Sequence, residues 1–436
     1  MLAWRGLPRY HAAMARKLLI IQAAALSRPL EGFPLPLRPI ETVFPAVTCT
    51  VQASFRTASL PSRHGMIANG IFHRDLRRAM FWEQSARLVA GERIWSGFRR
   101  RGGKVAMLFW QQSLGEDVDV VLSPAPIHRH HGGMIPDCYS QPPGLYEKLC
   151  RAVGRCFRLQ HYWGPLASAR AGDWIAEATL ALLRDRSLAP EVCLTYLPSA
   201  DYDLQRHDPL ASRAALDALA RLGAQLRQLI DSARELSYEV VVFGDYAVTP
   251  VQRAVYPNRA LAEAGLLATR TVKDMLYPDL YTSRAFAMVD HQVAHVYAPA
   301  AAELERTRAV LSQLPGVDTV MDRREQAAAG VDHPNAGELV IVAQTGTWFA
   351  YPWWTGAAGA PEFARHVDIH NKPGYDPCEL FFGWPPMTVS LDSGRVHGSH
   401  GRAGKDGPVV AAWTPALGEP KDIVELAQAV ARWLNE

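Results

Sequence analysis

The chain has little net charge, no paired cysteine motif and no long apolar run, and each absence excludes a class of protein. Its 46 basic and 43 acidic residues leave a formal net charge of +3, too small an excess to grip a nucleic-acid backbone. Its six cysteines form no CxxC pair, so the sequence predicts neither a zinc ribbon nor a disulfide scaffold. We expect the cysteines to be reduced thiols in a cytoplasmic protein. What remains is a chain of 436 residues, 48% hydrophobic, that can bury a large core.

The N-terminus superficially resembles a secretion signal, because basic residues precede the apolar run Leu18–Leu26. That run contains Gln22 and is too short to span a bilayer. Four prolines follow it instead of a second apolar segment. We therefore expect a buried first strand, no membrane segment, and an N-terminal extension over residues 1–15.

Short apolar runs alternate with helical patterns along the chain. The predicted strands are Leu18–Ala25, Val105–Trp110, Val118–Leu122, Val192–Leu197, Val240–Phe243 and Ala285–Val289. The clearest predicted helices are Ala211–Leu236 and Asp422–Leu434. This alternation predicts an α/β fold with a largely parallel sheet and helices on both faces. Ligands of such sheets bind beyond the carboxyl ends of the strands, where Asp201, Asp245 and Asp290 stand here.

A smaller unit is predicted inside this core. A helix over Glu303–Leu314 and strands over Val317–Met321 and Glu338–Ala343 suggest a small α/β cap or insertion at 298–345. The core would then consist of 16–297 and 346–436, with the insertion overhanging the site.

The most specific stretch is Val43–Gly70, which reads VFPAVTCTVQASFRTASLPSRHGMIANG. It resembles the nucleophile segment of type I phosphodiesterases and nucleotide pyrophosphatases of the alkaline phosphatase superfamily, with a Thr ahead of a P-x-x-HG turn and an Asn-Gly. Further resembling segments include YWGPLAS, YLPSADYDLQR, DHQVAHVY, ARHVDIHNKPGYDP and GSHGR. The resemblance covers essentially the whole chain.

This resemblance implies that Thr48 is the nucleophile. A metal on its oxygen would lower the hydroxyl pKa, and amide groups at a helix start would face the phosphoryl oxygens. A phosphothreonine intermediate would follow. Without the resemblance, Thr48 reads equally as one of many turn hydroxyls.

The metal ligands that the resemblance implies are only partly present. Asp201 matches one ligand, but Gln205 stands where a His is expected four residues later. Asp245 matches the Asp of an Asp-His pair, but Tyr246 replaces the His. No carboxylate occurs in 22–27, Val51 replaces an Asn that steadies the phosphoryl group, and His400 matches the late His.

We therefore expect a remodelled site with one tightly held ion, although two ions stay an option. The candidate ligands are Thr48, Asp201, Asp245, His291, His295 and His400. His291 and His295 are four residues apart, as on one helical face. Zinc is the expected metal, and manganese or iron would accept the same ligands.

Each of these residues also has a structural interpretation. His291 and His295 could be core histidines, Asp290 could orient a ligand imidazole, and His207 could lie on the surface. Tyr246 could be a packed aromatic or a catalytic phenol that donates to substrate. The cluster at 128–131 is expected to be a solvated loop, and the aromatics at 348–354 could line a pocket or fill a seam.

The sequence thus predicts a metal-dependent hydrolase that cleaves a phosphodiester or pyrophosphate in a small molecule, as a monomer or a homodimer. The alternatives are a repurposed member with another metal-assisted reaction, in secondary metabolism, and a degenerate binding protein.

Overall fold

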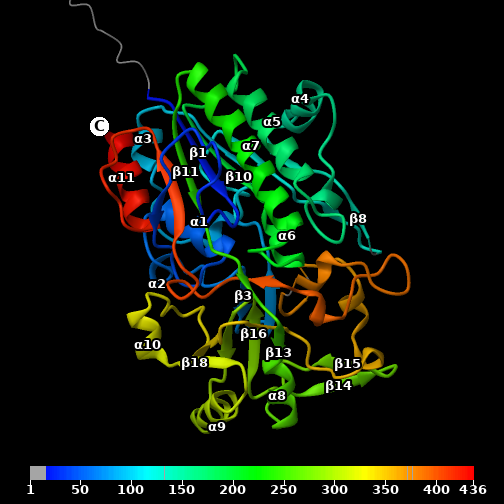
Figure 1. Ribbon diagram of the computed structural model, residues 1–436. Helices are drawn as coiled ribbons and strands as arrows, with labels where there is room; N and C mark the ends of the chain where they lie inside the picture. The colour runs from blue at the N-terminus through cyan, green and yellow to red at the C-terminus, as the bar shows by residue number, and fades with distance from the viewer. Residues whose placement is uncertain (1–15, 132, 371, 376) are drawn as a thin grey trace, which may run out of the picture.

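The computed structural model describes residues 16–131, 133–370, 372–375 and 377–436 (Figure 1). The predicted extension at 1–15 lies outside the described residues. Two sheets stand one above the other, each with its own core, and the candidate site lies between them (Figure 1).

The larger sheet has eight strands in the order β2-β22-β11-β1-β10-β5-β6-β9. Its parallel strands are β1 (Leu18–Ala23), β5 (Val105–Leu108), β6 (Val120–Ser123), β10 (Val192–Leu197) and β11 (Glu239–Gly244). The remaining strands are β2 (Arg38–Ile40), β9 (Tyr139–Gln141) and β22 (Val409–Trp413), of which β9 and β22 run antiparallel to their inner neighbours. Strand β1 is buried along its whole length between β10 and β11, which fits the continuous apolar run in its sequence.

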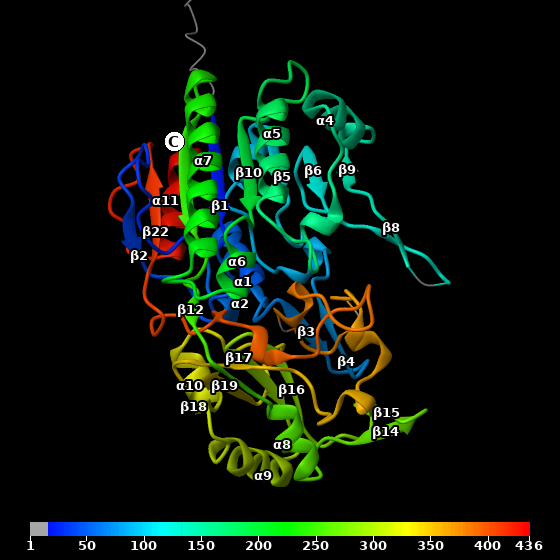
Figure 2. The same ribbon diagram turned by 45° about the vertical axis from the view of Figure 1, so that its right-hand side comes forward.

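Helices cover both faces of this sheet (Figure 2). One layer contains α4 (Leu145–Val153), α5 (Arg170–Leu183) and α7 (Arg213–Glu235). The other contains α1 (Thr48–Thr57), α3 (Ser96–Arg100) and α11 (Ile423–Asn435). The aromatic ring of Phe55 in α1 stacks on Phe243 of β11 at 4.5 Å, which fixes α1 against the sheet. The predicted α/β class with helices on both faces is confirmed.

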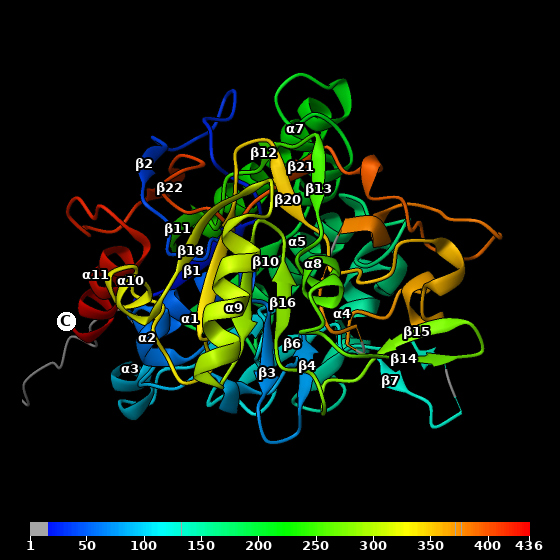
Figure 3. The same cartoon turned by 90° about the horizontal axis from the view of Figure 1, so that it is seen from below.

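The smaller sheet is antiparallel, in the order β16-β17-β19-β18. Its strands are β16 (Phe286–Asp290), β17 (Val293–Tyr297), β18 (Val317–Met321) and β19 (Leu339–Ala343). Helices α8 (Pro257–Glu263), α9 (Ala301–Ser312) and α10 (Arg323–Ala328) lie around it when the molecule is seen from below (Figure 3).

The predicted boundary at residue 298 cuts through this sheet, because β17 before the boundary pairs with β19 after it. The predicted boundaries of the insertion are therefore wrong, because the insertion is part of a sheet that already begins at β16.

The segments outside the two main sheets form short strand pairs and helices. They are α2 (Pro61–His64), β3 (Gly70–His73), β4 (Arg78–Phe81), β7 (Ile127–His128), β8 (Met134–Ile135), α6 (Asp201–Arg206), β12 (Thr249–Pro250), β13 (Arg253–Val255), β14 (Thr269–Val272), β15 (Met275–Pro278), β20 (Thr347–Phe349) and β21 (Gly398–Ser399).

The six cysteines form no disulfide with one another. Among the described residues, we find no helix with the length and apolar character needed to cross a bilayer.

Candidate active site

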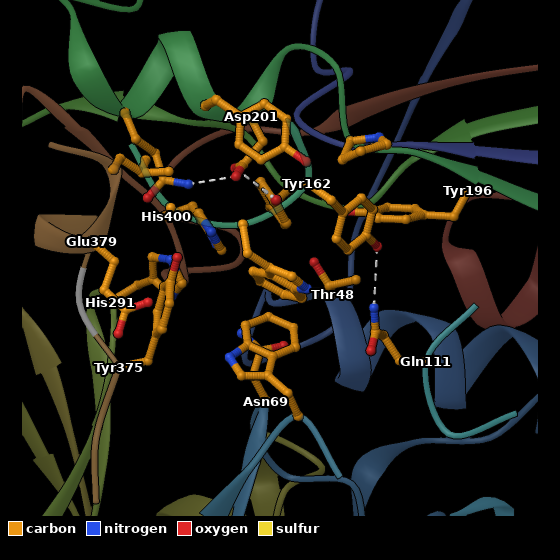
Figure 4. Close-up of a pocket in the computed structure, with 18 residues that line it drawn as sticks. Thr48, Asn69, Gln111, Tyr162, Tyr196, Asp201, His291, Tyr375, Glu379 and His400 are labelled. Atoms are coloured by element: carbon orange, nitrogen blue, oxygen red, sulfur yellow. Dashed lines mark hydrogen bonds between the residues drawn. The ribbon is translucent and has the colours of Figure 1, made fainter. Parts of the chain in front are cut away.

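A small pocket lies where the strands of the larger sheet end and the smaller sheet begins (Figure 4). Its cavity holds about 40 Å³ of free space, room for a few atoms rather than a whole ligand. Five of the residues proposed from the sequence line it. These are Thr48, Asp201, Tyr246, His291 and His400.

Thr48 is the first residue of α1, and its side chain is 4% exposed. Val47, the residue before this helix, is extended and apolar, and its side chain makes no capping hydrogen bond. The first amide groups of a helix carry partial positive charge, so a helix start that faces a pocket favours an anion. The Thr48 hydroxyl also interacts with the Tyr196 hydroxyl across the pocket. Thr48 thus stands where a phosphoryl group would meet the helix.

Asn69 fixes the start of α1 to the smaller sheet. Its Oδ1 accepts a hydrogen bond from the Cys49 amide at 3.0 Å. Its own amide donates to Asp290 Oδ2 at 2.8 Å, and its Nδ2 donates to Oδ1 at 3.1 Å. Asn69 was assigned no role from the sequence, although it belongs to the Asn-Gly that ends the segment Val43–Gly70.

His291 lies in the turn between β16 and β17, with a φ of 59°. A side chain other than glycine seldom adopts this left-handed backbone conformation, and such residues concentrate at functional sites. Its Nδ1 donates to Asp290 Oδ1 at 2.7 Å, since a carboxylate can only accept. Its Nε2 is buried without a partner among the described residues. Nε2 is therefore the ring nitrogen that no side chain or backbone group of the described residues uses.

His400 stands beside His291, with ring centroids 4.0 Å apart. Its Nδ1 donates to the carbonyl of Ala46 at 2.8 Å, two residues before Thr48. Burial, and then the proximity of His291, hold the pKa of His400 well below its usual value. The ring is consequently neutral, and it lies flat against Tyr246 at 3.5 Å.

The carboxylate of Asp201 is bonded to two neutral donors. The Tyr246 hydroxyl donates to Oδ1 at 2.8 Å, and Gln205 Nε2 donates to Oδ2 at 2.6 Å. Burial raises the pKa of Asp201, while the bond from Tyr246 opposes that rise. His207, the alternative to Gln205, is exposed at the end of α6.

Asp245 follows β11 but does not line the pocket. Gln22 Nε2 donates to its Oδ2 at 2.9 Å, and the amides of Ala25 and Tyr246 each donate to its Oδ1 at 3.0 Å. Burial raises the pKa of this carboxyl to about 7. Gln22, near the end of β1, thus occupies one side of the Asp245 carboxylate. The resemblance calls for a second carboxylate in this part of the chain.

His295 does not join the site either. The premise that it shares a helical face with His291 is wrong, because both belong to a β-hairpin. Its Nε2 donates to the Ile67 carbonyl at 3.0 Å, and its Nδ1 accepts from the Gly337 amide at 3.3 Å. Both ring nitrogens are used, so His295 is one of the core histidines that the structural interpretation allowed.

Thr48, Asp201, His291 and His400 therefore line one pocket, whereas Asp245 and His295 do not, and the predicted ligands form no metal site. Across the described residues, no three His, Cys, Asp or Glu side chains are placed to hold a metal ion. Gln22, Gln205 and Tyr246 take ligand positions that the resemblance implies, and each donates a hydrogen bond to a carboxylate that an ion would need. The donor set does not fit the expected zinc, manganese or iron centre, with one ion or with two.

The family profile of type I phosphodiesterases and nucleotide pyrophosphatases matches residues 37–376 of this sequence. The chain belongs to this family. It is a phosphoester or pyrophosphate hydrolase of the alkaline phosphatase superfamily, which confirms the resemblance. No curated protein sequence matches the chain.

Solved structures of this superfamily share the fold. Phosphonoacetate hydrolase from Sinorhizobium meliloti 1021, in complex with phosphonoacetate, superposes with a TM-score of 0.62 at 16% identity, over 95% of each chain. Murine ectonucleotide pyrophosphatase/phosphodiesterase 5 superposes with a TM-score of 0.56 at 15% identity, over 96% of this chain and 95% of that one. Identities this low bear on the fold alone.

Several pocket residues were missed by reasoning from the sequence. They include Asn69, Tyr162, Trp163, Tyr375 and Glu379. Tyr162 and Trp163 begin the YWGPLAS segment, which is one of the segments that carry the family resemblance. The composition of that segment does not point to a pocket.

Proposed function

We propose that this hydrolase cleaves a phosphoester of a small molecule with Thr48 as the nucleophile and His291 as the proton acceptor. The observation that carries the proposal is the unpartnered Nε2 of His291, whose side chain lines the same pocket as Thr48. Asp290 holds the ring so that this nitrogen carries the lone pair.

The reaction divides into two displacements. As the Thr48 oxygen bonds to phosphorus, its proton passes to His291 Nε2 and the bond to the leaving oxygen breaks. The imidazolium returns that proton to the leaving oxygen. Water then attacks the phosphorus of the phosphothreonine and gives a proton to the same nitrogen. The bond from phosphorus to the Thr48 oxygen breaks, and His291 returns the proton to that oxygen.

The other pocket residues bind and position. Amide groups at the start of α1 face the phosphoryl oxygens and stabilise their charge. Tyr246 donates to Asp201 and packs against His400, so we assign it a positioning role in place of the catalytic role expected from the sequence.

The experiment is turnover of bis-p-nitrophenyl phosphate by variants of Thr48. Thr48→Ala should abolish turnover, whereas Thr48→Ser keeps a hydroxyl and should retain part of it. Turnover by Thr48→Ala equal to that of the native chain would remove Thr48 from the mechanism.

His291→Ala should lower kcat by about 10²–10⁴-fold, the usual contribution of a general base. A single-turnover measurement in the same variant should show slower release of nitrophenolate. Burst kinetics identical to those of the native protein would assign the proton to another group.

A further inference from the structure

The pocket around Thr48 is too small for a whole substrate. Its 40 Å³ of free space suits the reacting phosphoryl group, so the organic part of a substrate must lie outside it. The surface next to the pocket therefore decides which phosphoesters the site accepts.

An apolar groove adjoins the pocket and shares Trp163 with it. We define the apolar groove by Met134, Leu159, Trp163, Leu166, Ile369 and Phe382. Its free volume is about 270 Å³, near the lower end of the range of about 300–1,000 Å³ for small-molecule sites. A second, more polar space joins the two, because it too is lined by Trp163 and shares Trp82 and Gln111 with the pocket.

The mouth of the apolar groove is exposed although it is hydrophobic. Leu166 is 53% exposed and Phe382 is 57% exposed. Large exposed apolar side chains that gather beside a catalytic pocket mark a binding surface more often than single scattered ones do.

Charge in the apolar groove is sparse. None of its described lining residues is a lysine or an arginine, and Asp368 is the acidic side chain among them. Burial lowers the pKa of His370, which also borders the groove, so that imidazole is largely neutral. The groove thus offers no cation for a second phosphate, as a nucleotide polyphosphate would require.

From this juxtaposition we propose that the substrate is a phosphoester of an apolar alcohol, with its alkyl or aryl part in the apolar groove and its phosphoryl group at Thr48. The proposal rests on the proposed function. Each methylene buried from water strengthens binding by up to about fourfold, so affinity should rise steeply with chain length.

The test measures binding without turnover. Isothermal titration of the native protein with methyl-, butyl- and octylphosphonate, which cannot be hydrolysed as esters, should give a Kd at least tenfold lower for octyl- than for methylphosphonate. Adenosine monophosphate should bind more weakly than octylphosphonate.

The matched variants are two leucines of similar exposure. Leu166→Asp places a charge in the apolar groove and should raise the Kd for octylphosphonate at least tenfold. Leu210→Asp alters a leucine that is 61% exposed elsewhere and lines neither space, so octylphosphonate affinity and ester turnover should stay native.

Two outcomes separate this proposal from the one it rests on. Equal affinity for all three phosphonates, or tighter binding of adenosine monophosphate, would overturn the apolar substrate even if Thr48 proves to be the nucleophile. If phosphonate affinity rises with chain length but the protein hydrolyses no ester, the apolar groove would be supported as a binding site and the proposed reaction would be refuted.

Discussion

Three neutral side chains stand at positions where the family resemblance implies metal ligands. Gln22, Gln205 and Tyr246 each donate to Asp245 or Asp201. A cation would have to displace these donors and leave their polar groups unpaired, which costs free energy for each buried group. The replacement of the expected ligands could be read from the sequence. The hydrogen bonds that the replacing side chains make to Asp201 and Asp245 could not, because they depend on the folded geometry.

Restoring the ligands should restore a metal site. The triple substitution Gln22→Asp, Gln205→His and Tyr246→His should raise the zinc content, measured by mass spectrometry after dialysis, to at least one ion per chain. The native protein should retain less than this, and its ester turnover should survive treatment with a chelator. Loss of native activity on chelation, regained on adding zinc, would contradict the conclusion that these donors do not fit a metal ion.

Asp245 gives a pH-dependent prediction. Burial raises its pKa in the folded protein to about 7, above the value of about 3.9 in an unfolded chain. The folded state therefore binds the proton more tightly, so this group's contribution to stability is full below about pH 4 and is lost as pH rises toward 7. The loss is of the order of 4 kcal/mol, from the size of the pKa shift.

Asp245→Asn should flatten this part of the stability profile in urea titrations from pH 4 to pH 7. Gln22 can reverse its amide to meet the new donor, because its Oε1 has no partner among the described residues. A profile with the native slope would show that another group titrates in that interval.

At the scale of elements, the smaller sheet depends on β19. Ile341 is fully buried and pairs with Ala294 of β17 and Val320 of β18. Ile341→Ala should lower the free energy of unfolding by about 2–5 kcal/mol, because it leaves a cavity in the core. Val272→Ala, in the exposed hairpin β14–β15, should change it by less than about 0.5 kcal/mol in the same denaturant titration. Equal effects of the two substitutions would mean that the smaller sheet contributes little to global stability.

The parallel strands of the larger sheet could be read from the sequence with small errors at their ends, whereas β2, β9 and β22 were not predicted. Strand β10 begins and ends as predicted, and α7 differs from its prediction by one or two residues at each end. These elements carry unambiguous signals, since a buried parallel strand is a continuous apolar run and an amphipathic helix repeats every 3.6 residues.

Strand β16 was predicted at Ala285–Val289, but β17 was missed because the turn between the two strands carries no glycine or asparagine. His291 and Gln292 occupy that turn, and the usual marker of a tight turn is therefore missing. Both strands are also fully buried, so neither shows the alternation that would distinguish a strand from a helix. The spacing of the two histidines was consequently attributed to a helical face.

At the scale of the molecule, the pocket joins the two sheets. Thr48 and Asp201 come from the larger sheet and its helices, whereas His291 comes from the smaller one. A domain boundary drawn from the sequence could not show this, because pairing between distant strands leaves no local pattern. The site exists only when both sheets are folded.

A phosphoryl mimic should therefore stabilise both sheets together. Orthovanadate at 100 times its Kd should add about 2.7 kcal/mol to the free energy of unfolding. Hydrogen exchange should slow at the start of α1 and at the β16–β17 turn in the same titration. Protection confined to one of them would mean that the anion binds elsewhere, and Thr48→Val serves as the control for binding at the nucleophile.

Asp290 accepts hydrogen bonds from the Asn69 backbone, the Asn69 side chain and His291. Through Asn69 it also reaches the amide of Cys49, next to Thr48. The pair that we propose as reacting, Thr48 and His291, is thus braced independently of the loops that surround Leu166 and Ile369. Descendants of this protein could exchange those loops, and with them the alcohol they accept, while inheriting the cleavage chemistry intact.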